Sequence, residues 1–225
     1  MTKKKDYSKV LICRILLFDL DGVLVDSIAN VERHWSEWAK RHQLDVQQVL
    51  SSIHGRRTID TIRLVAPKLQ ADNEARYLDD IQTLDTNGVV ATEGATELLA
   101  QLAPEQWAIV TSGPATLARA RLRAAKLPLP RLLISAHDVK QGKPDPEGYL
   151  KAAELMRAEP EECLVIEDSL PGIEAAHTAH IPAIAVGNTH PRAELKSAEL
   201  WIPSLKLLSI IDTEEENEIA LAVSE

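Results

Sequence analysis

The stretch that decides the fold is Phe18 to Ser27, FDLDGVLVDS, which follows the apolar run Val10–Phe18. The run predicts a buried strand, and Asp19 and Asp21 stand where that strand opens into a loop. Two carboxylates so close together repel each other unless a positive charge lies between them. An oxygen-rich site suits Mg²⁺, and active sites of open parallel sheets lie at the carboxyl ends of their strands. The pair is therefore placed for metal-assisted chemistry.

A calcium-binding loop is the other interpretation of the Asp-x-Asp pattern. That loop requires an oxygen ligand at its fifth position and glycine at its sixth. Here these two positions are Val23 and Leu24, so the calcium-binding interpretation fails.

Composition limits the class of protein. The chain has 225 residues, of which 45% are hydrophobic, so it can form a substantial core plus one inserted module. A net charge of −9 argues against a nucleic-acid groove or an anionic membrane surface. Cys13 and Cys163 lie in apolar runs and are expected to be buried free thiols in a reducing compartment. We therefore expect a cytoplasmic protein that binds neither nucleic acid nor membrane.

Short β-rich runs alternate with helical stretches through most of the chain, a pattern that predicts right-handed βαβ units and a parallel sheet. The expected strands are Val10–Phe18, Trp107–Thr111, Arg131–Ser135, Cys163–Glu167, Ala183–Val186 and Leu200–Ile202. The expected helices between them are Gly94–Leu102, Ala115–Ala125, Glu147–Arg157, Gly172–Ala179 and Arg192–Ser197.

The segment between the first two strands contains only helical patterns. Val31, Trp35 and Trp38 recur at helical spacing, and further helical segments follow. The insert, residues 28–88, is too long for a loop, so we expect a helical cap over the carboxyl end of the sheet. The predicted organisation is an α/β, Rossmann-like parallel-sheet core from residues 1–27 and 89–212, a small helical cap domain at 28–88, and a loosely ordered acidic tail at 213–225.

Polar residues of the kind needed for phosphoryl transfer occur at four places along the expected rim of the sheet. Each alone has a structural explanation, such as a turn or a helix start, but their order along one rim favours a shared site. The four are Asp19 with Asp21, Thr111-Ser112-Gly113, Lys143 in Gly142-Lys143-Pro144, and Glu167-Asp168.

These segments resemble the four motifs of the haloacid dehalogenase-like hydrolase superfamily, in the subgroup with a helical cap after the first motif. The resemblance covers about residues 10 to 210. Segments 53–58, 107–113 and 138–144 further resemble bacterial sugar and hexitol phosphatases and the glycerol-phosphate phosphatases. The resemblance implies a phosphoric monoester hydrolase that acts on small phosphorylated sugars or polyols, and a monomer is expected for a member of this size.

The resemblance also implies the catalytic roles. Asp19 would be the nucleophile that takes the phosphoryl group as an aspartyl-phosphate, and Asp21 would be the general acid and base. The Thr111 hydroxyl and the backbone N–H groups of Ser112 and Gly113 would hold phosphate oxygens.

The implied cofactor is Mg²⁺. Its ligands would be Asp19, Asp168 and the backbone carbonyl of Asp21, with Glu167 acting through a metal-bound water. Four carboxylates sum to −4, and a proton on Asp21, the Lys143 ammonium and a dication bring that sum to zero. Only then can a phosphate dianion enter without strong repulsion.

Substrate recognition beyond the phosphate is expected from the cap. His54, Arg56 and Arg57 flank Gly55, which is expected to form a tight turn, and arginine suits phosphate and hydroxyl recognition. Spacing alone does not choose between the two arginines. Trp35 and Trp38 are expected to pack within the cap, with a wall for a sugar as the other interpretation.

Two alternatives remain open beside the phosphatase. A phosphomutase of the β-phosphoglucomutase type shares the motifs but resembles a pattern with a cap histidine ten residues after the second aspartate, where this chain has Val31. A non-catalytic phosphate or Mg²⁺ sensor is the second alternative, and the intact set of catalytic residues argues against it.

Overall fold

The computed structural model describes residues 7–211, 213 and 218–224. Its centre is a six-stranded sheet in which every neighbouring pair of strands is parallel. The strand order is β6-β5-β2-β7-β8-β9. Their bounds are β2 Ile15–Phe18, β5 Trp107–Val110, β6 Leu133–Ile134, β7 Cys163–Glu167, β8 Ala183–Val186 and β9 Leu200–Ile202.

Helices cover both faces of this sheet because its strands are apolar on both sides. Leu16 and Phe18 of β2 enter one core cluster, whereas Ile15 and Leu17 enter the other, as the alternation along a strand requires. The first cluster contains side chains of α5 and α6, and the second contains side chains of α7 and α8. The bounds are α5 Ala95–Leu99, α6 Ala115–Ala124, α7 Glu147–Leu155 and α8 Leu170–Thr178.

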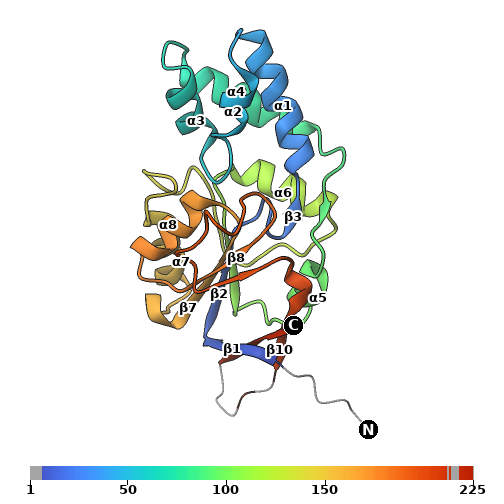
Figure 1. Ribbon diagram of the computed structural model, residues 1–225, viewed down its shortest axis with the longest axis vertical. Helices are drawn as coiled ribbons and strands as arrows, with labels where there is room; N and C mark the ends of the chain where they lie inside the picture. Colours follow the sequence, from blue (N-terminus) through green and yellow to red (C-terminus); the bar gives the residue numbers. More distant parts are fainter. Residues whose placement is uncertain (1–6, 212, 214–217, 225) are drawn as a thin grey trace.

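A helical region stands at one end of the sheet (Figure 1). It has its own core, in which Trp35 and Trp38 pack edge to face with ring centroids 5.4 Å apart. A short antiparallel ribbon of β3 Val25–Asp26 and β4 Val90–Ala91 joins it to the sheet. The helices are α1 Ile28–Arg41, α2 Val46–Leu50, α3 Thr58–Val65 and α4 Ala71–Leu84. The predicted fold class, a parallel-sheet core with an inserted helical region, is confirmed.

The expected first strand, Val10–Phe18, is wrong as a single element. The chain forms β1 (Tyr7–Cys13) and then β2, and Arg14 separates them. The Arg14 backbone N–H donates to the Glu162 carbonyl, and its guanidinium pairs with the Glu162 carboxylate at 2.9 Å. β1 therefore leaves the parallel sheet and joins a separate antiparallel one.

The predicted loosely ordered tail is also wrong where the structure describes it. Ile219–Ser224 forms β11, the middle strand of the antiparallel sheet β1-β11-β10, where β10 is Leu208–Ile211. Five consecutive residues of β11 are buried, which explains the order. The acidic residues Glu214, Glu215 and Glu216 lie outside the described residues.

The helix expected at Arg192–Ser197 is replaced by turns. The Glu194 N–H donates to the Pro191 carbonyl in a single turn, and the buried Leu195 side chain then ties the segment to the core. Short 3₁₀ segments occur at Pro160–Glu162 and Leu205–Leu207. Within the part of the chain that the structure describes, no helix is long and apolar enough to cross a bilayer.

Candidate active site

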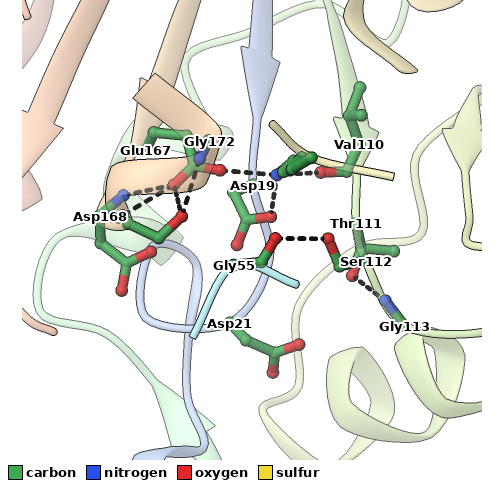
Figure 2. Close-up of polar contacts among 12 residues, drawn as sticks. Asp19, Asp21, Gly55, Val110, Thr111, Ser112, Gly113, Glu167, Asp168 and Gly172 are labelled. Carbon is green, nitrogen blue, oxygen red and sulfur yellow. Dashed lines mark hydrogen bonds and ion pairs between the residues drawn. The ribbon is translucent and has the colours of Figure 1, made fainter. Parts of the chain in front are cut away.

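The parallel register brings the four predicted motifs to one edge of the sheet. Asp19 follows β2, and its N–H donates to the Ile166 carbonyl at 3.0 Å. Thr111 follows β5, Glu167 ends β7, and Asp168 comes next. Because the carboxyl ends of parallel strands meet at the same edge, these residues are drawn together, as Figure 2 shows.

Lys143 is the centre of the charge network. Its ammonium donates to Asp19 at 2.5 Å, to Glu167 at 2.6 Å and to the Val110 carbonyl at 3.1 Å. All three charged side chains are buried. Burial acts against the Lys143 ammonium, but the Asp19 and Glu167 carboxylates raise the Lys143 pKa well above its usual value. The lysine is thus a permanent cation between two carboxylates.

Both carboxylate oxygens of Glu167 accept hydrogen bonds. Besides Lys143, it accepts hydrogen bonds from the Tyr149 hydroxyl and from the backbone N–H groups of Asp168 and Ser169. Burial acts to raise the pKa of Glu167, but the Lys143 charge and these hydrogen bonds hold it below the usual value. A Cβ at Gly172, in the first turn of α8, would lie 1.7 Å from the Glu167 carboxylate, so a larger residue does not fit there without a shift.

The carboxylates fit a metal ion. One oxygen each of Asp19, Glu167 and Asp168 lies within 4.8 Å of the others, and all three side chains are buried. Asp168 Oδ2 is buried without a hydrogen-bond partner among the described residues, and burial followed by the Glu167 charge raises the Asp168 pKa well above its usual value. A Cβ at Gly22 would meet that same oxygen. An oxygen donor set with one free, buried carboxylate oxygen suits a hard divalent cation.

The pKa of Asp19 is raised for the same reason as that of Asp168. Burial raises its pKa to about 7, with the Lys143 ammonium opposing the rise and the Glu167 charge adding to it. Added positive charge at this point would restore the ionised carboxylate that a nucleophile needs.

Asp21 is not part of the cluster that Asp19, Glu167 and Asp168 form. Figure 2 shows its side chain turned away from Asp19. One carboxylate oxygen accepts from the Ser27 hydroxyl at 2.6 Å, and the other accepts from the Arg121 guanidinium at 2.6 Å. Arg121 was not predicted, yet a signal exists: this cation stands four residues after Leu117, on the buried face of α6.

The predicted phosphate-binding segment makes one internal hydrogen bond and one to the helical region. The Gly113 N–H donates to the Thr111 hydroxyl at 3.1 Å, and the Ser112 hydroxyl donates to the Gly55 carbonyl at 2.8 Å (Figure 2). The second bond joins the core to the helical region directly beside the site. The phosphate-binding role of this segment stays a prediction.

The structure separates the three residues predicted from the helical region. His54 and Arg56 line the pocket that Asp19 also lines, together with the apolar side chains of Val31 and Trp35. Burial lowers the pKa of His54.

Arg57 lies outside this pocket. It pairs with Asp60 at 2.6 Å and donates to the Lys140 carbonyl at 3.1 Å. The sequence left open which of the two arginines contacts the substrate. Only Arg56 lines the pocket, so the structure favours Arg56.

Comparison with known proteins agrees with this arrangement. A family model described as haloacid dehalogenase-like hydrolase matches residues 13–180. Hexitol phosphatase A of Escherichia coli (strain K12) is 42% identical over 203 residues, covering 88% of this chain and 94% of that protein. Glycerol-1-phosphate phosphohydrolase 2 of Saccharomyces cerevisiae is 31% identical, covering 77% of this chain and 74% of that protein.

A solved structure of a hydrolase from Pseudomonas syringae is also similar, with a TM-score of 0.71 and 27% identity, covering 85% of this chain and 94% of that one. The predicted enzyme class, a hydrolase of the phosphatase kind, is confirmed by these relatives. The chain belongs to the haloacid dehalogenase-like hydrolase family.

Proposed function

We propose that this protein is a Mg²⁺-dependent phosphatase that hydrolyses small phosphorylated polyols or sugars through an aspartyl-phosphate on Asp19. The observation that carries the proposal is the buried cluster of Asp19, Glu167 and Asp168. Lys143 bridges the first two, and an oxygen of the third has no hydrogen-bond partner among the residues that the structure describes. The substrate class is supported by relatives whose names specify hexitol and glycerol phosphates.

Asp19 and Asp21 divide the chemistry between them. In the first half-reaction an Asp19 oxygen bonds to phosphorus while the bond from phosphorus to the substrate alcohol breaks, and Asp21 gives that alcohol oxygen its proton. In the second, Asp21 takes a proton from water, and the water oxygen bonds to phosphorus as the bond to Asp19 breaks. Inorganic phosphate leaves, and both aspartates return to their starting states.

A bound metal ion and Lys143 would supply positive charge for these steps. Asp19, Asp168 and the backbone carbonyl of Asp21 would hold Mg²⁺, with Glu167 acting through a water molecule. The bound dication would supply charge that keeps Asp19 ionised and neutralises phosphoryl oxygens. Lys143, which donates to Asp19, would add positive charge for the same purpose.

Arg121 changes the charge balance expected from sequence. Four carboxylates contribute −4, Lys143 and Arg121 return +2, and a dication brings the total to zero with Asp21 ionised. The proton that Asp21 carries in the first half-reaction then makes the site positive, which favours a phosphate dianion.

We propose that residues 28–88 act as a cap that excludes water and recognises the alcohol part of the substrate. His54, Arg56, Thr58 and Gln82 are polar residues that it contributes to the pocket, and Trp35 contributes an apolar surface. Val31 argues against the phosphomutase alternative, because valine offers no proton-carrying group where that pattern has a histidine.

A panel of phosphate esters tests the proposal. Purified protein with Mg²⁺ should release phosphate from glycerol 1-phosphate, a hexitol phosphate or 2-deoxyglucose 6-phosphate, and excess EDTA should stop that release. Asp19→Asn should lower kcat by at least about 10³-fold because an amide is a poor nucleophile, whereas Asp72→Asn on the exposed side of α4 should have no effect.

Full activity in EDTA would reject the metal requirement, and near wild-type turnover by Asp19→Asn would reject the nucleophile. Net isomerisation of a sugar phosphate without phosphate release would favour the phosphomutase. Ligand binding without any turnover would favour the sensor.

A further inference from the structure

Arg121 is a buried cation in the active-site pocket that no predicted motif contains. Its side chain is only 4% exposed, and its guanidinium makes two contacts to side chains of other segments. One nitrogen donates to Asp21 at 2.6 Å and the other to the Gln82 amide oxygen at 2.9 Å. Burying a guanidinium is costly unless its partners are well placed, so this position demands an explanation beyond packing.

The two partners of Arg121 belong to different parts of the molecule. Asp21 lies in the loop after β2 of the sheet, whereas Gln82 lies in the last turn of α4, in the helical region. Figure 1 shows α6, which carries Arg121, directly beneath that region. Gln82 is itself held in place, because its amide nitrogen donates to the Leu78 carbonyl at 3.1 Å. Arg121 therefore links the orientation of Asp21 to the position of α4.

The direction of Asp21 suits a general acid. In an in-line displacement the attacking and leaving oxygens lie on opposite sides of phosphorus, so an acid that serves the leaving oxygen must point away from the nucleophile. Asp21 is turned away from Asp19 and lines the pocket (Figure 2). Ser27 and Arg121 hold one carboxylate oxygen each, so both contacts together define this direction.

We propose that Arg121 is a positioning residue: it aims the Asp21 carboxyl at the alcohol oxygen of the substrate, and Gln82 makes that aim depend on the placement of the helical region. This inference rests on the proposed phosphatase function. The proton donor is then correctly directed only when α4 is seated over the pocket, which couples closure of the helical region to protonation of the leaving group.

The leaving group provides the test. An alkyl phosphate such as glycerol 1-phosphate needs its departing oxygen protonated, whereas p-nitrophenyl phosphate releases a stable phenolate without that help. The ratio kcat/KM reports only the steps up to departure of the alcohol. Misdirecting a catalytic group by about 1 Å costs about 100-fold. Arg121→Met should therefore lower kcat/KM about 100-fold for glycerol 1-phosphate and less than about 5-fold for p-nitrophenyl phosphate.

Three further variants sharpen the experiment. Arg121→Lys should restore part of the glycerol 1-phosphate activity, because a lysine can still donate to Asp21. Gln82→Leu keeps the Arg121–Asp21 pair and should show a smaller loss, about 10-fold, that is likewise selective for glycerol 1-phosphate, even where Arg121→Met fails to fold. Arg123→Met, an exposed arginine of the same helix, is the matched control and should leave both ratios unchanged.

Equal losses on the two substrates would show that Arg121 only supports the fold, and unchanged ratios would show that it has no role in the reaction. Either result overturns the inference. A selective loss in Arg121→Met without one in Gln82→Leu would overturn the coupling to α4. Failure of the wild-type protein on both substrates would instead reject the proposed function, and the inference with it.

Discussion

Gly172 shows how a single residue controls the electrostatics of the site. Any Cβ there would overlap the Glu167 carboxylate, which is buried and bonded to Lys143. Gly172→Ala must therefore push Glu167 away from the lysine or shift the start of α8. We expect overpacking to lower the free energy of unfolding by about 1–3 kcal/mol, measured by urea denaturation.

Gly113→Ala is the matched control for this substitution. A Cβ at Gly113 meets its nearest neighbours at 3.6 Å, an ordinary contact distance. Its free energy of unfolding should stay within about 0.5 kcal/mol of wild type. An equally stable Gly172→Ala protein would contradict the close approach of α8 to Glu167.

The two cysteines make a second prediction at the scale of single residues. Burial raises the pKa of Cys13 and of Cys163 to about 12. Thiolate is the reactive form, and raising the pKa lowers its fraction at pH 8, so both thiols should react very slowly with Ellman's reagent in the native protein. Two thiols per chain should react promptly after denaturation in guanidinium. A fast native thiol would show that one of these sites opens to solvent.

At the scale of elements, periodicity predicted the parallel strands and most helices because each has one clear hydrophobic pattern. It failed where a polar residue changes the partner of a strand: Arg14 is a single position in an apolar run, yet its bonds to Glu162 divide β1 from β2. Pairing of β11 with β1 joins residues about 210 positions apart, and no local pattern specifies such a contact.

The sequence likewise predicted part of the candidate site, namely its motif residues, but not the buried Arg121. Its motif residues stand beside strand ends in the sequence, and the parallel sheet brings them together. Arg121 was missed because it lies in the last turn of α6, where a cation is usually solvated. The separation of Arg56 from Arg57 likewise required structure, because it depends on the Lys140 carbonyl, which belongs to another segment.

At the scale of the whole molecule, the antiparallel sheet lies at the opposite end from the helical region (Figure 1). Its middle strand, β11, still contributes to the main core, since Leu221 is fully buried in the cluster that contains Phe18.

Leu221→Ala should therefore lower the stability of the protein without changing its catalytic activity. Leucine-to-alanine changes in cores cost about 2–5 kcal/mol, so the midpoint of urea denaturation should fall sharply. The same change at Leu84, which is 86% exposed, should have little effect. The kcat/KM of folded Leu221→Ala protein should match wild type, because the strand lies far from Asp19, and a Leu221→Ala protein as stable as wild type would show that β11 does not belong to the core.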